Sequence, residues 1–291
     1  MSVRFLVALL LTAQSGAIEF FGGPLYWRAT ETAEWAVTLS PFPNPSRVAY
    51  QTISFDWDPG LRVGAAYRCG CWDTQLAYTQ FWTRASDRVR GNVVSGFLGT
   101  TVLQIGPYEA GGVRWSLDYL TLDWEGGRTY FATPRLSFRP AIGLKGGRIY
   151  QSIRTEWENL AVLLVATENL QQKFWGFGPK GSLGANWTLC RQLSLFADFG
   201  AAFMWGHWSI SDHFLDDFGT GVDIQTGRRN FGSLVVQGLM GVSFAYSPIT
   251  FKLGYEIQDW FNQYQVFDDT TGTHNNDLVL RGLSFSLLFA Y

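Results

Sequence analysis

Two histidines and three aspartates lie close together in the chain, and these residue types can carry general acid–base chemistry. They are His207, Asp212, His213, Asp216 and Asp217. Such catalysis needs a carboxylate that orients a histidine. Acidic groups clustered in loops are usually solvated, and no second acidic pair that would face this group can be identified. The sequence also lacks a Gly-x-Ser-x-Gly nucleophile turn and a phosphate-binding loop. We therefore predict no catalytic residue and no enzymatic activity.

The three cysteines are the other reactive side chains, and their number is odd. They are Cys69, Cys71 and Cys190. A bond between Cys69 and Cys71, which flank a single glycine, would be strained, so pairing with Cys190 or with a neighbouring molecule is the preferred interpretation. The alternative is three unpaired thiols near turns. None of the three histidines stands beside a cysteine with metal-ligand spacing, and we predict neither a metal nor a cofactor.

Charged side chains fall on one face of several segments whose other face is apolar. Around residue 62, for example, Leu61 and Val63 fall on one face while Arg62 and Arg68 fall on the other. Successive side chains of a strand point to opposite faces, so the two rows would meet different surroundings. The charges that this pattern assigns to an inner, lumen-lining row are Arg62, Arg68, Arg139, Lys145, Lys180, Asp198, Lys252 and Glu256.

Strands must position these charges, and the chain shows about ten segments with period-2 alternation between residue 18 and its end. The final segment is the clearest, because Leu283, Phe285, Leu287, Phe289 and Tyr291 share one face. Short connections alternate with long ones along the chain. The predicted tight turns lie near residues 70, 134, 190 and 247, and the predicted long connections are 31 to 54, 85 to 111, 152 to 171, 210 to 228 and 264 to 277.

An apolar row against lipid and a polar row against water are typical of an all-β transmembrane antiparallel up-and-down β-barrel. We predict about ten strands, with twelve as the alternative, short turns facing the periplasm and long loops outside. The segment from 113 to 131 breaks phase near Tyr119, which predicts a bulge. A soluble sandwich is the competing fold, but the second strand face here is rich in Gly, Ser and Thr.

Composition supports the barrel, since 16% of the residues are aromatic, 16% are charged, and 13 are Trp. Barrels carry aromatic girdles at both membrane interfaces. A net charge of −2, without a clustered basic run, argues against nucleic acid as a partner. The predicted outer girdle is Trp175, Phe203, Trp205, Trp208 and Phe261, and the predicted inner girdle is Trp72, Trp187, Tyr246 and Tyr291.

The first 17 residues have the pattern of a secretory signal. Arg4 precedes an apolar run from residue 5 to 11, and small residues allow cleavage after Ser15 or Ala17. The apolar run is too short to span a bilayer. We therefore predict a signal peptide over 1–17 and a single barrel domain over 18–291, located in the bacterial outer membrane.

Several segments also resemble a known family. They are LYWRA (25 to 29), WDPGLRVGAAYR (57 to 68), LAYTQF (76 to 81), LSFRPAIGLKGG (136 to 147), FWGFGPKGSL (174 to 183), LSLFADFGAA (193 to 202) and LGYEIQDWFNQ (253 to 263). In this order they resemble the Legionella-type major outer membrane protein family, which is similar to porins of environmental chlamydia relatives. The resemblance implies a pore-forming outer-membrane barrel that is sometimes disulfide-linked to neighbours or homo-oligomeric. It implies no catalytic residues.

About ten strands leave a narrow lumen, because barrel diameter grows with strand number. We predict a porin-like protein that lets ions or small polar solutes diffuse passively, with outer-membrane lipid as its surroundings. Excess positive charge in the lumen would favour anions. Two alternatives stay open: the inward charges pair and plug the lumen, or the protein is a surface structural protein or adhesin. The first long connection contains Trp35, Phe42, Tyr50 and Phe55. These aromatics could form a sticky surface or fold inward and constrict the lumen, but ordinary loop packing is the preferred interpretation.

Overall fold

The computed structural model describes residues 16–39, 48–97, 107–159, 164–217, 219, 221–265 and 275–290. The predicted signal peptide falls almost wholly outside these ranges. Within them, no helix is long and apolar enough to cross a membrane. The strands found there are β1 (Ala17–Thr32), β2 (Glu34–Leu39), β3 (Val48–Thr52), β4 (Trp57–Cys69), β5 (Trp72–Ser95), β6 (Tyr108–Arg128), β7 (Tyr130–Thr133), β8 (Leu136–Asn159), β9 (Leu164–Thr188), β10 (Leu193–Asp216), β11 (Gly221–Tyr246), β12 (Ile249–Trp260) and β13 (Asn275–Ala290).

Ten of these strands close into an antiparallel barrel, which confirms the predicted fold and strand number. Each ring strand pairs with the next one in chain order, and β13 pairs with β1 to close the ring. The ring strands are β1, β4, β5, β6, β8, β9, β10, β11, β12 and β13. Three strands lie off the ring. The β2–β3 hairpin continues from the end of β5, and β7 pairs with the start of β8.

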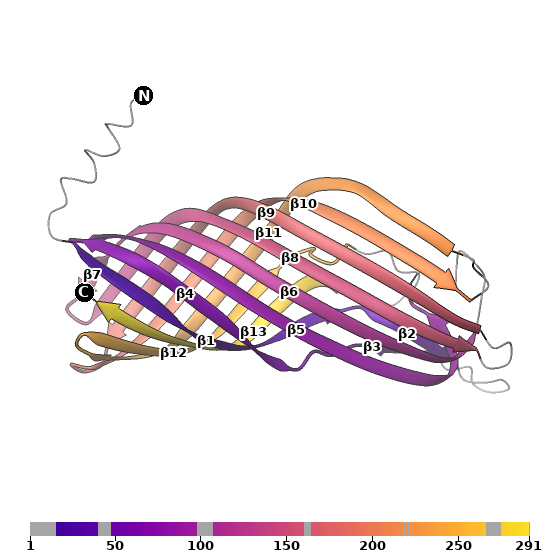
Figure 1. The fold of residues 1–291 in the computed structure, drawn as a ribbon. Helices are drawn as coiled ribbons and strands as arrows, with labels where there is room; N and C mark the ends of the chain where they lie inside the picture. The colour runs from indigo at the N-terminus through magenta and orange to yellow at the C-terminus, as the bar shows by residue number, and fades with distance from the viewer. Residues whose placement is uncertain are drawn as a thin grey trace, which may run out of the picture.

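The two ends of the barrel differ, as Figure 1 shows. One end of the barrel carries the tight connections β4–β5, β7–β8, β9–β10 and β11–β12. The start of β1 and the end of β13 lie at the same end, which we call the turn end. The β4–β5 connection needs a left-handed residue, which Gly70 supplies with φ of 61°. The opposite end, which carries the β2–β3 hairpin, is the loop end.

A continuous apolar surface covers the outer wall from the turn end to about mid-height, and we call it the lipid-facing band. Its members alternate with inward side chains on every ring strand, as lipid contact requires. Leu283, Phe285, Leu287 and Phe289 of β13 belong to it and are 38 to 50% exposed. The band ends at a ring of exposed side chains: Tyr26, Trp57, Trp82, Leu122, Leu144, Trp175, Trp205, Leu234, Ile257 and Leu283.

Beyond the lipid-facing band the strands continue, but the polarity of their two faces inverts. On β5 the outward row changes from Trp82 to Arg84, and the inward row changes from Thr79 to Phe81. On β6 the outward row passes from Leu122 to Asp118. We call the part of the barrel beyond the band the loop half. It has a more polar outer surface and an interior rich in large apolar side chains, as in a water-soluble protein, although buried polar groups such as Glu31, Asp212 and Asp216 also lie inside it.

This inversion explains four wrong sequence predictions, namely three expected loops and one expected bulge. The expected loops 85 to 111, 152 to 171 and 210 to 228 are largely strand, because β5 extends to Ser95, β8 to Asn159 and β10 to Asp216. The bulge expected near Tyr119 is absent, since β6 pairs in unbroken register with β8 from Ala110 to Gly127. The apparent phase break is the point where the two faces of one regular strand exchange polarity.

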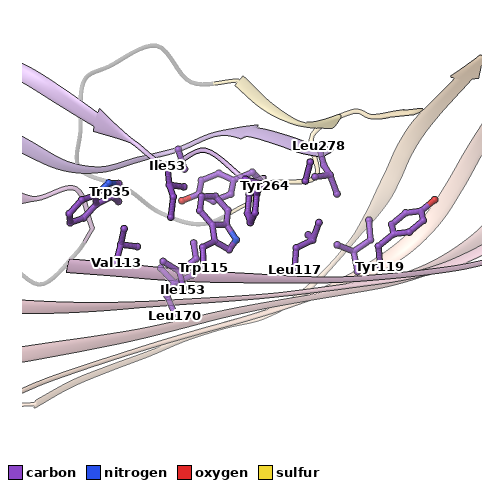
Figure 2. Packing of buried hydrophobic residues seen from close by; sticks show 14 of the residues in the cluster. Trp35, Ile53, Val113, Trp115, Leu117, Tyr119, Ile153, Leu170, Tyr264 and Leu278 are labelled. Atoms are coloured by element: carbon purple, nitrogen blue, oxygen red, sulfur yellow. The ribbon is translucent and has the colours of Figure 1, made fainter. Parts of the chain in front are cut away.

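An apolar core fills the interior of the loop half (Figure 2). Part of it comes from the wall, including Trp115 of β6. The rest comes from segments that fold inward: Trp35 of β2, Phe55 before β4, and Tyr264 after β12 are all at most 2% exposed. Inward folding is therefore the correct interpretation for Trp35 and Phe55. Tyr50 is exposed, and Phe42 lies outside the described residues.

Candidate functional site

A layer of aromatic side chains crosses the lumen near mid-height, and we call it the aromatic layer. Its ring centroids lie 5.8 Å apart for Trp27 and Phe81, 6.4 Å for Trp27 and Tyr119, and 5.7 Å for Tyr119 and Trp260. Tilted and edge-to-face rings at such distances attract one another. The complete layer is Trp27, Phe81, Tyr119, Phe174, Trp208 and Trp260.

Trp208 was expected in the outer girdle, and that prediction is wrong. Its side chain is fully buried and packs on Phe174 with 4.4 Å between ring centroids. Trp208 lies beyond the lipid-facing band on β10, where the inward face is apolar. Trp175 and Trp205, by contrast, are exposed on the outer wall as predicted.

On the turn side of the aromatic layer, Arg62 of β4 pairs with Glu256 of β12. Arg62 Nη1 and Nη2 each lie 2.9 Å from a Glu256 carboxylate oxygen, which gives a bidentate ion pair. The same carboxylate accepts hydrogen bonds from Ser284 Oγ and Gln258 Nε2, both at 2.7 Å. Arg62 Cζ also lies 5.5 Å from the centre of the Trp27 ring, so this ion pair contacts the aromatic layer directly.

A second set of ion pairs joins β5 and β6 to β8 and β9. Asp123 accepts from Lys145 Nζ at 3.1 Å and from Lys180 Nζ at 2.9 Å. Lys180 Nζ also lies 2.6 Å from Glu125 Oε1. Arg139 Nη1 is 3.3 Å from Glu125 Oε2, and Arg139 Nε donates to Asp73 at 2.8 Å. Most of the inward charges are thus paired with one another, whereas Lys252 and Asp198 make no ion pair within 4.0 Å among the described residues.

These ion pairs surround a cavity of about 320 Å³ inside the lipid-facing half. It runs from Leu25 and Gln258, next to the aromatic layer, to Arg68 and Thr129 near the turn end. All the predicted lumen charges line it except Lys145, which binds Asp123 behind it. The charged lining residues are Arg62, Arg68, Arg139, Lys180 and Lys252, against Glu19, Asp73, Asp123, Glu125, Asp198 and Glu256.

Sequence reasoning identified the basic half of this lining and missed most of the acidic half. Asp73 directly follows the β4–β5 turn, and Asp123 and Glu125 lie in the strand where an interrupted phase was expected. Unbroken period-2 alternation through β6 would have placed both of its acids inward beside Thr121. With them included, the lining carries similar numbers of both signs, so the expected positive excess is absent.

The acid–base candidates are separated by the barrel wall. His213 of β10 is exposed on the outer face, whereas Asp212 and Asp216 are buried on the inner face. His207 lies on the outer face too, with its ring 6.3 Å from that of Trp175. The wall therefore prevents these histidines and the inward aspartates from sharing a substrate. Among the described residues, no cluster of three or more His, Cys, Asp or Glu could hold a metal ion.

The three cysteines are free thiols at the turn end. Cys69 and Cys71 flank the β4–β5 turn, and Cys190 lies in the β9–β10 turn. The strands of the second turn are separated from those of the first by β1, β13, β12 and β11 on one side of the ring and by β6 and β8 on the other. This separation favours pairing with another molecule over a bond from Cys190 to Cys69 or Cys71, and both stay predictions.

Beyond the lipid-facing band, Glu31 is a buried acid whose protonation should affect stability. Gln151 Nε2 donates to Glu31 Oε1 at 3.1 Å, and Trp115 Nε1 donates to Gln151 Oε1 at 3.0 Å. Burial raises the pKa of Glu31 from 4.5 to about 8, and the Gln151 hydrogen bond opposes that rise. The folded barrel therefore holds a proton that the unfolded chain releases above pH 4.5.

We expect the stability that this proton provides to be full below pH 4.5, to fall as the pH rises towards 8, and to be absent above it. Glu31→Gln should flatten the pH dependence in this window, because the amide does not ionise. The midpoint of heat unfolding in detergent between pH 5 and 9 measures this, with exposed Glu109→Gln as the control. An unchanged slope in Glu31→Gln would contradict the assignment.

Comparison with known proteins places this geometry among outer-membrane barrels. A family model described as Legionella pneumophila major outer membrane protein precursor matches residues 14–291. The outer membrane protease OmpT from Escherichia coli has a similar fold, with a TM-score of 0.55 and 10% identity over 96% of this chain and 99% of that chain. A major outer membrane protein from Thermus thermophilus reaches a TM-score of only 0.34, at 12% identity over 96% of this chain and 100% of that chain. No curated protein sequence matches the chain.

Proposed function

Because the chain belongs to the family of the Legionella pneumophila major outer membrane protein precursor, we propose that it is a porin-like, non-enzymatic pore. In this proposal, ions or small polar solutes diffuse passively through a narrow lumen. The protein lies in the outer membrane, and in our proposal the turn end faces the periplasm, as short turns do in bacterial barrels.

One observation carries the proposal: the cavity of about 320 Å³ in the lipid-facing half, whose lining combines charged and amide side chains with apolar ones. A barrel that served only as an anchor could fill this space with packed side chains, as barrels of about eight strands do. Here, charged and amide side chains surround open space that extends towards the turn end. Such a lining lowers the cost of bringing a hydrated ion into the membrane.

The aromatic layer and the core beyond it close this path towards the loop end. Part of that core is borne by segments outside the strands, namely residues 53 to 56 and 261 to 265. These segments lie outside the strands, so a shift of residues 53 to 56 or 262 to 265 leaves the ladder between the ring strands in place, although it would break side-chain contacts such as Gln172 Nε2 to Gln263 O at 2.6 Å. Passage therefore requires the inward-folded segments to shift, and the resting conductance is small. The nearly balanced charge of the lining makes selectivity between anions and cations weak.

Reconstitution in planar bilayers tests the pore. Lys252 lines the cavity and makes no ion pair within 4.0 Å among the described residues. Lys252→Glu changes the cavity charge by two units without breaking such a pair, so we expect the reversal potential in a salt gradient to shift towards cation preference. Lys173→Glu, at an exposed outward site on β9, is the matched control and should leave the reversal potential unchanged.

A second function, that of a surface structural protein or adhesin, is favoured by one feature of the loop end. The hairpin strand β3 exposes Val48 (52%) and Tyr50 (39%) beyond the lipid-facing band. The pore function would be contradicted if planar bilayers showed no channel steps with the native protein and none with a variant that lacks the inward-folded side chains. Loss of cell binding on Tyr50→Ser in the same protein would then support the surface role.

A further inference from the structure

The outer wall just beyond the lipid-facing band carries a localised group of basic side chains on β5, β6, β8 and β9. All of them point outward and are exposed. The corresponding outward positions of β10 hold His207, Ser209, Ser211 and His213, whereas Arg28 of β1 and Arg281 of β13 form a separate outward basic pair outside this group. We define the arginine patch as Arg84, Arg114, Arg148, Arg154 and Lys173.

Strand register brings three of these cations together. Arg114 of β6 lies directly opposite Arg154 of β8, and Ser86 of β5 lies opposite Arg114 on its other side. Arg84, two residues before Ser86, is therefore a diagonal neighbour of Arg114. Like charges directly opposite one another destabilise a sheet. The arrangement becomes favourable when an anion sits between them.

The protein supplies few anions of its own at this place. Arg148 lies 3.6 Å from Asp118, and Arg154 lies 3.7 Å from Glu156, both at the outer limit of an ion pair. Among the described residues, no carboxylate lies within 4.0 Å of the guanidinium of Arg84 or Arg114. The space between the cations is instead occupied by the hydroxyl-bearing residues Ser86, Ser116 and Ser152.

The patch has the chemistry and the size of a phosphate site. Arginine binds phosphate through two parallel hydrogen bonds, and serine hydroxyls donate further ones. Ser116 and Ser152 are paired across β6 and β8, with Arg114 and Arg154 one step further along the same face. Four neighbouring strands at about 4.8 Å spacing make the patch about 15 Å wide, enough for more than one phosphate.

The height of the patch indicates where that phosphate comes from. Arg84 follows Trp82, the last lipid-facing residue of β5, and Lys173 similarly adjoins Trp175 on β9. A group bound here therefore lies at the membrane surface, with acyl chains able to run down the lipid-facing band. With the loop end outside the cell, this surface belongs to the outer leaflet, whose major lipid is a phosphorylated glycolipid.

We propose that the arginine patch binds the phosphate groups of an outer-leaflet glycolipid of the lipid A type, between Arg84, Arg114 and Arg154 and above Ser116 and Ser152. The lipid fills the space between like charges and fixes one side of the barrel in the membrane. This site is separate from the lumen and does not depend on whether the barrel conducts.

Native mass spectrometry of the detergent-solubilised mature protein, titrated with bisphosphorylated lipid A, tests the site. Arg84→Ser/Arg114→Ser/Arg154→Ser should raise the apparent Kd for bisphosphorylated lipid A by about tenfold or more, as expected when charge-assisted hydrogen bonds are lost. The matched control, Arg128→Ser/Arg135→Ser/Arg191→Ser, removes three exposed arginines at the turn end and should bind like the native protein. Heat-modifiable migration on SDS gels verifies that both variants are folded.

Two further titrations separate the lipid from a free ion. Lipid A stripped of its phosphates should bind the native protein about as weakly as bisphosphorylated lipid A binds the triple variant. Millimolar inorganic phosphate should displace bisphosphorylated lipid A only partly, because it lacks the acyl chains. Equal Kd values for native protein and triple variant, equal binding of the dephosphorylated lipid, or full displacement by inorganic phosphate would each overturn the proposal.

Discussion

Replacing Arg62 by methionine should lower the free energy of unfolding by about 3–5 kcal/mol, because it leaves the buried Glu256 carboxylate without its counter-charge. Glu256 is 3% exposed, and the pair is bidentate with both distances at 2.9 Å. Hydrogen bonds from Ser284 and Gln258 remain in the variant, but neither carries a charge. Urea unfolding in detergent, followed by tryptophan fluorescence, measures the loss.

Two further variants separate the ion pair from the loss of side-chain packing. Arg62→Met/Glu256→Leu removes both charges, so it should recover most of the lost stability. Arg68→Met makes the same substitution on the same strand, where Arg68 is 59% exposed and pairs with Glu19 at 3.1 Å. That pair should contribute only about 0–1 kcal/mol. A similar loss in Arg62→Met and Arg68→Met would show that the buried pair has no special role.

The second large effect concerns the segments that close the loop half. Ile53→Ser/Phe55→Ser/Tyr264→Ser should raise the single-channel conductance several-fold, because these buried side chains come from connections and not from the wall. Phe55 and Tyr264 both pack against Trp115, with ring centroids 5.5 and 6.0 Å apart. Without them, water can enter between the wall aromatics. The barrel itself should remain closed, since no ladder hydrogen bond is removed.

Val48→Ser/Tyr50→Ser is the matched control for this experiment. It alters exposed side chains of the first long connection and should leave the conductance unchanged. Removing large buried apolar groups also costs about 2–5 kcal/mol each, so the triple variant must be shown to be folded by its gel migration. A folded triple variant with native conductance would place the constriction in the aromatic layer alone.

The lipid-facing half was predictable from the sequence because one simple rule governs it. Hydrocarbon on one side of the wall requires apolar side chains at every second position, and Leu283 to Phe289 follow that rule. The same alternation placed Arg62, Arg139 and Lys180 on the inner face, and all three side chains line the cavity. Strand number and closure followed from counting such segments between tight turns.

The loop half was less predictable because the rule reverses there without any change in strand geometry. At Trp82 and Arg84 the outer surface leaves the lipid, and the sequence offers no marker except the change in polarity itself. Interpreted as a loss of the period-2 alternation, this change in polarity predicts loops in place of the strands that the structure has. The pairing of Asp123 with Lys145 and Lys180 was also hidden, since it joins residues across three strands. Local periodicity assigns a face to a side chain, but not a partner.

The reversed polarity of the loop half has a consequence for biogenesis. In the proposed orientation, the charged exterior of that half has to cross the bilayer to reach its final position, and we expect its aromatic interior to pack only after that crossing. Insertion thus precedes consolidation of the most apolar part of the protein. Until then, tryptophan-rich stretches such as those around Trp115 and Trp157 need shielding by a periplasmic holdase, and failed crossing would leave the chain prone to aggregate.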